Sequence, residues 1–360
     1  MATSLTAPLY RLHELAFRTQ YAELKERSRS AGQLLPGTPG RLVVRDATGH
    51  AYWYRGYNST PGHAVEDFVC KAADLAALEE TRSRVEFAQW ATSQVRSLRK
   101  LEFQVADKGV ARVLVELHNT GLFAAGLTVV GTLCYTAWLN ELGAKAVAAR
   151  TQDIDLARRQ SLKLAAPLSF LKTVQATRLR FIPVPAMPSQ SPTTSVKLAG
   201  REGLRVDVLA PGKVLGAAVP IPELLWHAQT VPHYDYLLDE PREAAILAGG
   251  HCVPVKLPRP ERLVWHKLYS SASRQSFPEK AGKDLLQAVT LAAILAEQQD
   301  EVLGDSLHEV PASMATILKT RLPAIRRALA GHPQTLEQFE LALSQGRKKG
   351  QRVNTGRRLT

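Results

Sequence analysis

The stretch TQDIDLA (residues 151–157) predicts a β-strand that carries two carboxylates on one side. Side chains along a strand alternate between its faces, so Ile154 and Leu156 share one face and Asp153 and Asp155 share the other. Two carboxylates on one face repel each other unless a cation lies between them, and hard ions such as Mg²⁺ take oxygen ligands. The alternative is an exposed edge strand, where charged side chains are common.

A third carboxylate lies within another apolar strand pattern. In GLRVDVLAP (residues 203–211), Asp207 is flanked by Val206 and Val208. If this strand lies beside the first, the three aspartates would form a site for one or two Mg²⁺ ions, with Mn²⁺ as a substitute. Two ions about 3.5 to 4 Å apart can activate a hydroxyl and stabilise a leaving pyrophosphate. The three aspartates are therefore the candidate metal ligands.

A glycine turn precedes these aspartates. LTVVGT (residues 127–132) predicts a short strand ending in Gly131 and Thr132, and LCYTAWLNELG (residues 133–143) has helical spacing with Gly143 just past the C-cap. The uncharged stretch 119–140 is also long enough to cross a bilayer. Its glycines and threonines favour a buried strand followed by a helix, so we expect no association with a membrane.

Composition limits the class of protein. The chain has 360 residues, 45% hydrophobic and 22% charged, which excludes a disordered or fibrous protein and allows two or three domains. The formal net charge of +13 makes a polyanionic partner plausible. Part of the excess lies in the tail GRKKGQRVNTGRRLT (residues 346–360), which is either a solvated, disordered end or a nucleic-acid-binding segment.

Cysteines and the N-terminal residues indicate the compartment. Cys70, Cys134 and Cys252 are far apart and lack CxxC spacing, which disfavours a disulfide framework and a zinc site. The first residues contain charge and histidine before any long apolar run, so no signal peptide is predicted. A cytoplasmic location is expected.

Four regions are predicted along the chain. Their bounds are 1–115, 116–275, 276–346 and 347–360. The first region combines a helix over 10–31, a β-hairpin over 41–58 and a long helical stretch from Leu75 to Leu117. The second alternates strands and helices and contains the aspartates, the third is helical, and the fourth is the basic tail.

Two other sets of residues suggest weaker hypotheses. The long helical stretch carries basic residues that form either a solvated face or an RNA-facing stripe, namely Arg82, Arg84, Arg96, Arg99 and Lys100. Four histidines lack the spacing of metal ligands, namely His227, His233, His251 and His266. His266 is expected to pack within a helix, and AGGHC (residues 248–252) is expected to be a turn that enters a strand.

The glycine turn, the helix after it, the Asp-Ile-Asp motif and the later strand aspartate resemble the nucleotidyltransferase fold of the DNA polymerase β-like superfamily. Residues 234–288 and GHAYWYRGY (residues 49–57) are similar to bacterial stand-alone nucleotidyltransferase-like proteins related to the toxins of abortive-infection systems. The resemblance implies an α+β fold. A mixed sheet flanked by helices would be joined to an N-terminal helix and β-hairpin region and to a C-terminal helical domain.

The resemblance also assigns roles to residues. Asp153 and Asp155 would bind the catalytic ions, while Asp207 would bind one ion and help to deprotonate the acceptor hydroxyl. The backbone of Gly131 and Thr132 and the start of the next helix would hold the triphosphate. Basic residues would contact phosphates or fix the site, namely Lys267, Arg274, Lys280 and Lys283.

Two features depart from the superfamily pattern. Thr132 stands where Gly or Ser is usual, although its hydroxyl keeps the hydrogen-bonding chemistry. The segment between Thr132 and Asp153 exceeds the minimal spacing, which predicts that AKAVAAR (residues 144–150) is an added loop or an extra turn.

The predicted activity is metal-dependent transfer of a nucleoside monophosphate from an NTP to an acceptor hydroxyl, with release of pyrophosphate. The positive charge favours an RNA acceptor such as tRNA. A protein hydroxyl, a small molecule, and a toxin role with an antitoxin-like protein partner stay open. The competing hypotheses are a catalytically idle nucleotidyltransferase fold that serves as a nucleic-acid-binding module, and an intracellular scaffold.

Overall fold

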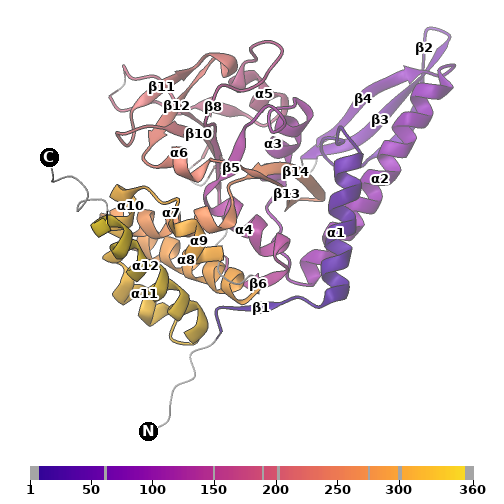
Figure 1. Cartoon of the computed structure of the whole chain (residues 1–360). Helices are drawn as coiled ribbons and strands as arrows, with labels where there is room; N and C mark the ends of the chain where they lie inside the picture. Colours follow the sequence, from indigo (N-terminus) through magenta and orange to yellow (C-terminus); the bar gives the residue numbers. More distant parts are fainter. Residues whose placement is uncertain are drawn as a thin grey trace.

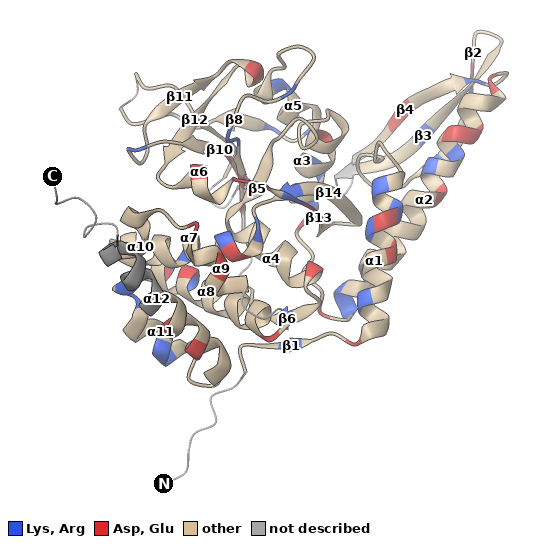
Figure 2. Cartoon of the chain, viewed as in Figure 1, with Lys and Arg blue, Asp and Glu red and all other residues tan. Residues whose placement is uncertain are grey.

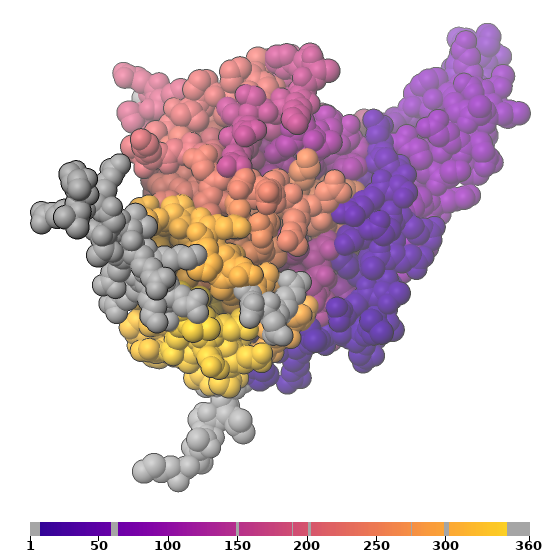
Figure 3. All heavy atoms as spheres, in the orientation of Figure 1, coloured from indigo at the N-terminus to yellow at the C-terminus, as the bar shows by residue number. Residues whose placement is uncertain are grey.

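The computed structural model describes residues 8–60, 63–148, 151–188, 190–200, 203–274, 276–298 and 302–352. An N-terminal arm, a central sheet with its helices, and a group of C-terminal helices follow one another along the chain (Figure 1). The space-filling view shows the arm extending away from the rest of the molecule (Figure 3).

The arm consists of a three-stranded antiparallel sheet beside a long helix. Its strands are β2 (Arg41–Ala47), β3 (His50–Thr60) and β4 (His63–Lys71), and its helix is α2 (Leu75–Lys100). The predicted hairpin is confirmed as β2 and β3, which pair antiparallel across a turn at Thr48 and Gly49, both with positive φ. The third strand, β4, was not predicted.

The long helical stretch predicted from Leu75 to Leu117 is wrong, because two helices occupy it. Helix α2 ends at Lys100 and α3 covers Lys108–Asn119. Glu102 between them has a φ of 69°, in the left-handed region that a helix interior excludes. Phe103 is buried, and Ala106 forms a parallel bridge with Ala248, so tertiary contacts fix the break.

The central sheet is mixed and carries the predicted strands. Its order is β11-β12-β10-β7-β5, with β9 paired to β10 and β8 to β9. The predicted strands over 127–132, 151–157 and 203–211 are confirmed as β5, β7 and β10. The bounds are β5 (Thr128–Val130), β7 (Asp153–Ala157), β8 (Phe181–Pro183), β9 (Ser195–Leu198), β10 (Arg205–Pro211), β11 (Ala218–Ile221) and β12 (Trp226–Val231).

Short elements connect these strands. Helix α4 (Gly131–Glu141) follows β5, as predicted, and Gly143 beyond it has a φ of 63°. Stretch 119–140 thus contains a strand and a helix, and none of the described helices is long and apolar enough to cross a membrane. The remaining connectors are α5 (Phe170–Ala176), a 3-10 turn (Pro222–Leu224) and α6 (Tyr234–Leu237).

The antiparallel hairpin of β13 (Arg242–Ala248) and β14 (His251–Leu257) leads into the C-terminal helices. As predicted, AGGHC contains a turn that enters a strand, with Gly249 and Gly250 in the turn and His251 starting β14. The helices are α7 (Pro260–Ser273), α8 (Pro278–Gln298), α9 (Val302–Leu307), α10 (Ala312–Lys319), α11 (Leu322–Ala328) and α12 (Pro333–Arg352). Helix α12 therefore reaches into the predicted basic tail, and residues 353–360 lie outside the described residues.

The base of the arm is tied to the core by helix α1 (Leu15–Ser30), which lies in the predicted helix over 10–31 and follows the short strand β1 (Tyr10–Leu12). Glu141, at the end of α4, accepts hydrogen bonds from the Tyr21 hydroxyl at 2.8 Å, Lys25 Nζ at 2.7 Å and the Ala245 backbone N–H at 2.8 Å. A buried cluster that includes Leu24 packs α1 and α2 against the β13–β14 hairpin. These contacts fix α1 and the hairpin to α4.

Candidate active site

The candidate site begins where two parallel strands place aspartates side by side. The register of β7 and β10 sets Asp155 opposite Asp207 and Asp153 opposite Arg205. Ile154 on the other face is fully buried, so the sheet separates an apolar face from an aspartate face. Asp153 is exposed and Asp155 is half-buried. The sequence-predicted aspartates are therefore neighbours.

Asp155 lies in surroundings that resist its ionisation. Burial first, and then the charges of Asp207 and Asp153, raise the pKa of Asp155 to about 7, while Lys267 and Arg274 act in the opposite direction. An unpartnered carboxylate at this position is unfavourable, because a buried charge needs compensation from an opposite charge. A bound cation would supply that compensation.

The glycine turn lies directly against Asp155. Val130, the last residue of β5, is opposite Asp155 on β7, and Gly131 begins α4 with a φ of 70°. A Cβ added to Gly131 would lie 2.0 Å from Asp155 Oδ2, so only glycine fits here. Thr132, in the first turn of α4, is buried. The start of a helix therefore lies beside the aspartates.

The residues added after α4 do not displace this turn. Residues 144–146 form β6 (Ala144–Ala146), which pairs antiparallel with β1 near the N-terminus. The predicted loop at 144–150 is thus partly a strand, and residues 149–150 lie outside the described residues. The departure in spacing is absorbed by β6 while Gly131 keeps its place beside Asp155.

Two of the predicted cations converge on one buried carboxylate. Lys267 on α7 lies 3.1 Å from Asp284 Oδ1, and Arg274 after α7 lies 2.6 Å from Asp284 Oδ2. The side chains of Lys267 and Asp284 are each only 6% exposed. Both cations also lower the pKa of Asp155, which locates them near the aspartates. Asp284 was not predicted, and its only signal is its position at the start of an apolar helical run, DLLQAVTLAAILA (residues 284–296).

The two remaining predicted cations, Lys283 and Lys280, have different surroundings. The pKa of Lys283 is lowered by burial first and then by Lys267, while the charge of Asp153 acts in the opposite direction, so Lys283 belongs to the same cluster. Lys280 is exposed, with its ammonium 5.6 Å from the centre of the Phe277 ring. Within the described residues no ion pair joins Lys280 to an aspartate, so a role for this residue at the site stays a prediction.

An aromatic residue that the sequence did not indicate also borders Asp155. Tyr234 on α6 is buried, and its pKa is raised by burial first and then by the charge of Asp155. The ring of His266 packs edge-on against Tyr234 at 5.1 Å between centroids. His266 therefore packs within helix α7, as predicted. No motif in the sequence singles out Tyr234.

The three aspartates offer oxygen ligands, but Asp207 has other partners. Its Oδ1 accepts hydrogen bonds from Arg205 Nε at 2.8 Å and from the hydroxyl of Ser195. No three His, Cys, Asp or Glu side chains among the described residues are gathered closely enough to hold a metal ion. Asp153 and Asp155 provide the carboxylate donors that suit Mg²⁺. Asp207 can join them through Oδ2, or by exchanging Arg205 for the ion at Oδ1.

The site thus combines a mixed sheet with neighbouring aspartates, a glycine turn against one of them and a cluster of cations. A family model described as Nucleotidyltransferase matches residues 108–311, more than half of the chain, and the chain belongs to this family. The match runs from α3 to Pro311 and includes the three aspartates, the Gly131 turn and the cations around Asp284. NTP-dependent nucleotidyl transfer is therefore its class of reaction. Neither the curated proteins nor the solved structures contain a match to this chain.

Proposed function

We propose that this nucleotidyltransferase moves a nucleoside monophosphate from a metal-bound NTP to the hydroxyl of a nucleic-acid acceptor, with RNA favoured. The observation that carries the proposal is the register that sets Asp155 opposite Asp207, together with Gly131 packed against Asp155. This arrangement joins a group that can take a proton, a place for a cation and a phosphate-binding turn.

The triphosphate would lie at the start of α4. The backbone N–H groups of Gly131 and Thr132, in the first turn of α4 where N–H groups have no partner within the helix, and the positive end of the helix dipole suit an anion. Lys267, Arg274 and Lys283 lie around the aspartates and would offset the charge that builds on the departing pyrophosphate. Asp284 would hold Lys267 and Arg274 in place.

Mg²⁺, or Mn²⁺ in its place, would be held by Asp153 and Asp155, with Asp207 as a further ligand. When bound, the ion would supply charge neutralisation at the phosphates and activation of the hydroxyl. Asp207 would take the proton of the acceptor hydroxyl. The hydroxyl oxygen then bonds to the α-phosphorus as the bond to the bridging oxygen breaks and pyrophosphate leaves.

The proposal of an RNA acceptor rests on the positive charge of the chain. The formal net charge of +13 favours association with a polyanion, and Lys and Arg residues occur along α1 and α2 (Figure 2). A defence or toxin role in the cytoplasm, with an antitoxin-like partner, is supported only by the resemblance to abortive-infection proteins. A neighbouring antitoxin gene would support it.

The direct test is transfer from each labelled NTP to RNA in the presence of Mg²⁺. The Asp153→Asn/Asp155→Asn variant should lose transfer. The control Asp46→Asn/Asp305→Asn removes two exposed carboxylates that form no ion pair with a described residue, and it should retain transfer. Equal transfer by wild type and the site variant would disprove the proposed site. RNA binding without transfer by the wild type would favour the idle nucleic-acid-binding module.

A further inference from the structure

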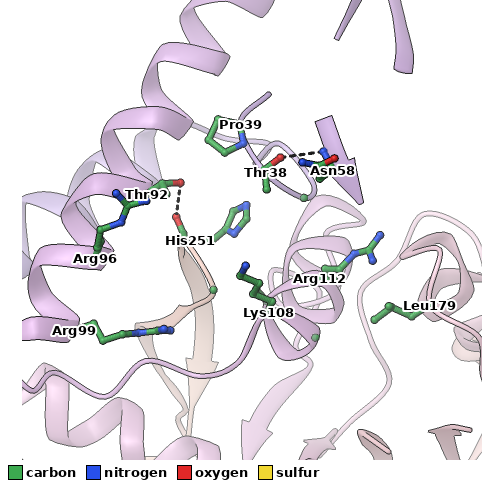
Figure 4. Close-up of a pocket in the computed structure, with 15 residues that line it drawn as sticks. Thr38, Pro39, Asn58, Thr92, Arg96, Arg99, Lys108, Arg112, Leu179 and His251 are labelled. Carbon is green, nitrogen blue, oxygen red and sulfur yellow. Dashed lines mark hydrogen bonds between the residues drawn. The ribbon is translucent and has the colours of Figure 1, made fainter. Parts of the chain in front are cut away.

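A cavity of about 690 Å³ lies where the arm meets the core. Its walls come from α2, from α3, from the turn between β13 and β14, and from residues 37–39 with Asn58 of β3 (Figure 4). None of its lining residues belongs to β5, β7, β10, α4, α7 or α8, which form the candidate active site. The cavity is therefore a second and separate site.

Four cationic side chains line this cavity without a carboxylate among the lining residues. Arg96 and Arg99 come from α2, and Lys108 and Arg112 come from α3. None of the four forms an ion pair with any residue in the part of the chain that the structure describes. In contrast, Arg82 on the same helix as Arg96 pairs with Glu79 at 2.6 Å. The predicted basic stripe is thus divided, and of its residues only Arg96 and Arg99 line the cavity.

One wall of the cavity holds an unsatisfied guanidinium atom. Arg112 Nη1 is buried without a hydrogen-bond partner among the described residues. Burial lowers the pKa of Arg112, and the nearby charge of Arg178 lowers it further, whereas Tyr57 acts in the opposite direction. A buried donor without a partner is unfavourable, and the positive charge of Arg112 adds to the positive potential at this wall of the cavity.

Hydrogen bonds hold the floor of the cavity in place before any ligand binds. Thr92 on α2 donates a hydrogen bond to the Gly250 carbonyl at 3.2 Å, and a Cβ on Gly250 would lie 2.8 Å from Thr92 Oγ1. The ring of His251 lies between the two helices in Figure 4, with its Nε2 2.9 Å from the Leu35 carbonyl. A rigid floor reduces the ordering cost of binding.

The lining residues favour contacts with the phosphates of a nucleic-acid backbone over recognition of a base. Arg96, Arg99 and Lys108 are exposed, so the cavity opens to solvent at its cationic side and a chain can continue beyond it. No Phe, Tyr or Trp is among the lining residues, and the imidazole of His251 is the one aromatic ring that the lining side chains of the described residues offer for stacking on a base. Phosphate contacts of this kind position a strand without regard to sequence.

We propose that this cavity binds phosphate groups of the single-stranded RNA acceptor and anchors the strand away from the aspartates. Arg96 and Arg99 would contact the strand from α2, while Lys108 and the start of α3 would contact it from the other wall. The inference rests on the proposed function, because it names the macromolecule that this transferase holds.

The test is binding of a fluorescently labelled, single-stranded 20-nucleotide RNA, measured by anisotropy over a series of salt concentrations in EDTA. Each phosphate contact on a single strand contributes about 0.7 to the slope of log K against log salt. Arg96→Ala/Arg99→Ala should therefore flatten the slope by about 1.4 and weaken binding about tenfold or more. The control Arg84→Ala/Lys100→Ala removes the same charge from α2 outside this cavity and should leave the slope unchanged.

Several outcomes would overturn the inference. Equal losses in the two variants would show a diffuse charge effect, and equal binding by wild type and the cavity variant would remove the cavity from recognition. If Arg96→Ala/Arg99→Ala lost ATP binding in EDTA but kept RNA binding, the cavity would be a nucleotide site instead. Both variants carry alanine within helix α2, where alanine is a good helix former, and matching melting temperatures confirm their folding.

Failure of this inference is distinguishable from failure of the proposed function. RNA binding in EDTA does not use the Mg²⁺ site, so Asp153→Asn/Asp155→Asn should bind RNA as the wild type does. A wild type that transfers nucleotide but does not bind RNA would overturn the inference alone. Loss of transfer in the aspartate variant with unchanged RNA binding supports both.

Discussion

Gly131 and Asp155 are packed so closely that no side chain fits between them. A Cβ on Gly131 would lie 2.0 Å from Asp155 Oδ2, and the φ of Gly131 is 70°. The first residue of α4 and the central aspartate of β7 are thus fixed relative to each other. Contact and backbone conformation both demand glycine, because a side chain would meet the carboxylate and a positive φ disfavours other residues.

Gly131→Ala should abolish nucleotidyl transfer and lower the free energy of unfolding by about 1–3 kcal/mol, since the alanine is strained and displaces Asp155. The measurements are transfer from labelled NTP and urea denaturation. Gly304→Ala on α9 is the matched control, because nothing lies within 4 Å of its added Cβ. Wild-type transfer in Gly131→Ala would show that the turn does not hold the substrate.

Asp284 should be a positioning residue for the cation cluster. In Asp284→Asn the buried Lys267 ammonium loses its partner, so the free energy of unfolding should fall by about 3–5 kcal/mol. Arg274 is 44% exposed and can turn to solvent, so its loss of a partner contributes less. Transfer should fall with a larger effect on kcat than on KM, because the cations offset charge on the leaving group.

A double variant separates stability from catalysis at this pair. Asp284→Leu/Lys267→Met replaces both buried charges with apolar side chains, which is often neutral for stability. We expect stability to return toward the wild-type value while transfer stays low. Recovery of transfer together with stability would contradict a role for Lys267 in the reaction.

Stability should fall in mild acid because of His266. Burial lowers the pKa of His266 from 6.5 to about 4, so below pH 6.5 the unfolded chain binds a proton that the folded protein refuses. Its contribution to the free energy of unfolding should fall by up to about 1.4 kcal/mol per pH unit between pH 6 and pH 4. In His266→Asn the free energy of unfolding, measured by urea denaturation at pH 7, 6 and 5, should fall less steeply as the pH decreases. An unchanged pH dependence would show that His266 titrates normally.

Arg205 should compete with the metal for Asp207. Its Nε lies 2.8 Å from Asp207 Oδ1, so Arg205→Leu leaves Asp207 uncompensated opposite Asp155. The Mg²⁺ concentration for half-maximal NTP binding should therefore decrease. Arg180→Leu, at an exposed arginine that forms no ion pair with a described residue, is the control. A higher Mg²⁺ requirement in Arg205→Leu would mean that Arg205 supports the metal site.

Local patterns predicted one half of the site well. Alternation in TQDIDLA placed Asp153 and Asp155 on one face, and the glycine turn was correctly placed between a strand and a helix. The pairing of β7 with β10 could not be predicted, because register between distant strands depends on the assembled core. The partner of Lys267 was missed for the same reason, since Asp284 lies on another helix.

The missed features of the fold have physical causes. The periodicity of apolar residues continues from α2 into α3, and it is the buried Phe103 and the bridge from Ala106 to Ala248 that interrupt the helix. Strand β4 contains Glu66 and Asp67 in an exposed sheet, which weakens the strand signal. Tertiary contacts decide both cases, and a single sequence does not display them.

The central claim is that Asp153, Asp155 and the Gly131 turn form the site for a metal-bound NTP. Isothermal titration with each of the four NTPs, with and without Mg²⁺, tests it most directly beside the Asp153→Asn/Asp155→Asn variant. We predict Mg²⁺-dependent binding of at least one NTP to the wild type and to Asp46→Asn/Asp305→Asn, with no such binding to the site variant. Equal Mg²⁺-dependent binding to the site variant would contradict the claim.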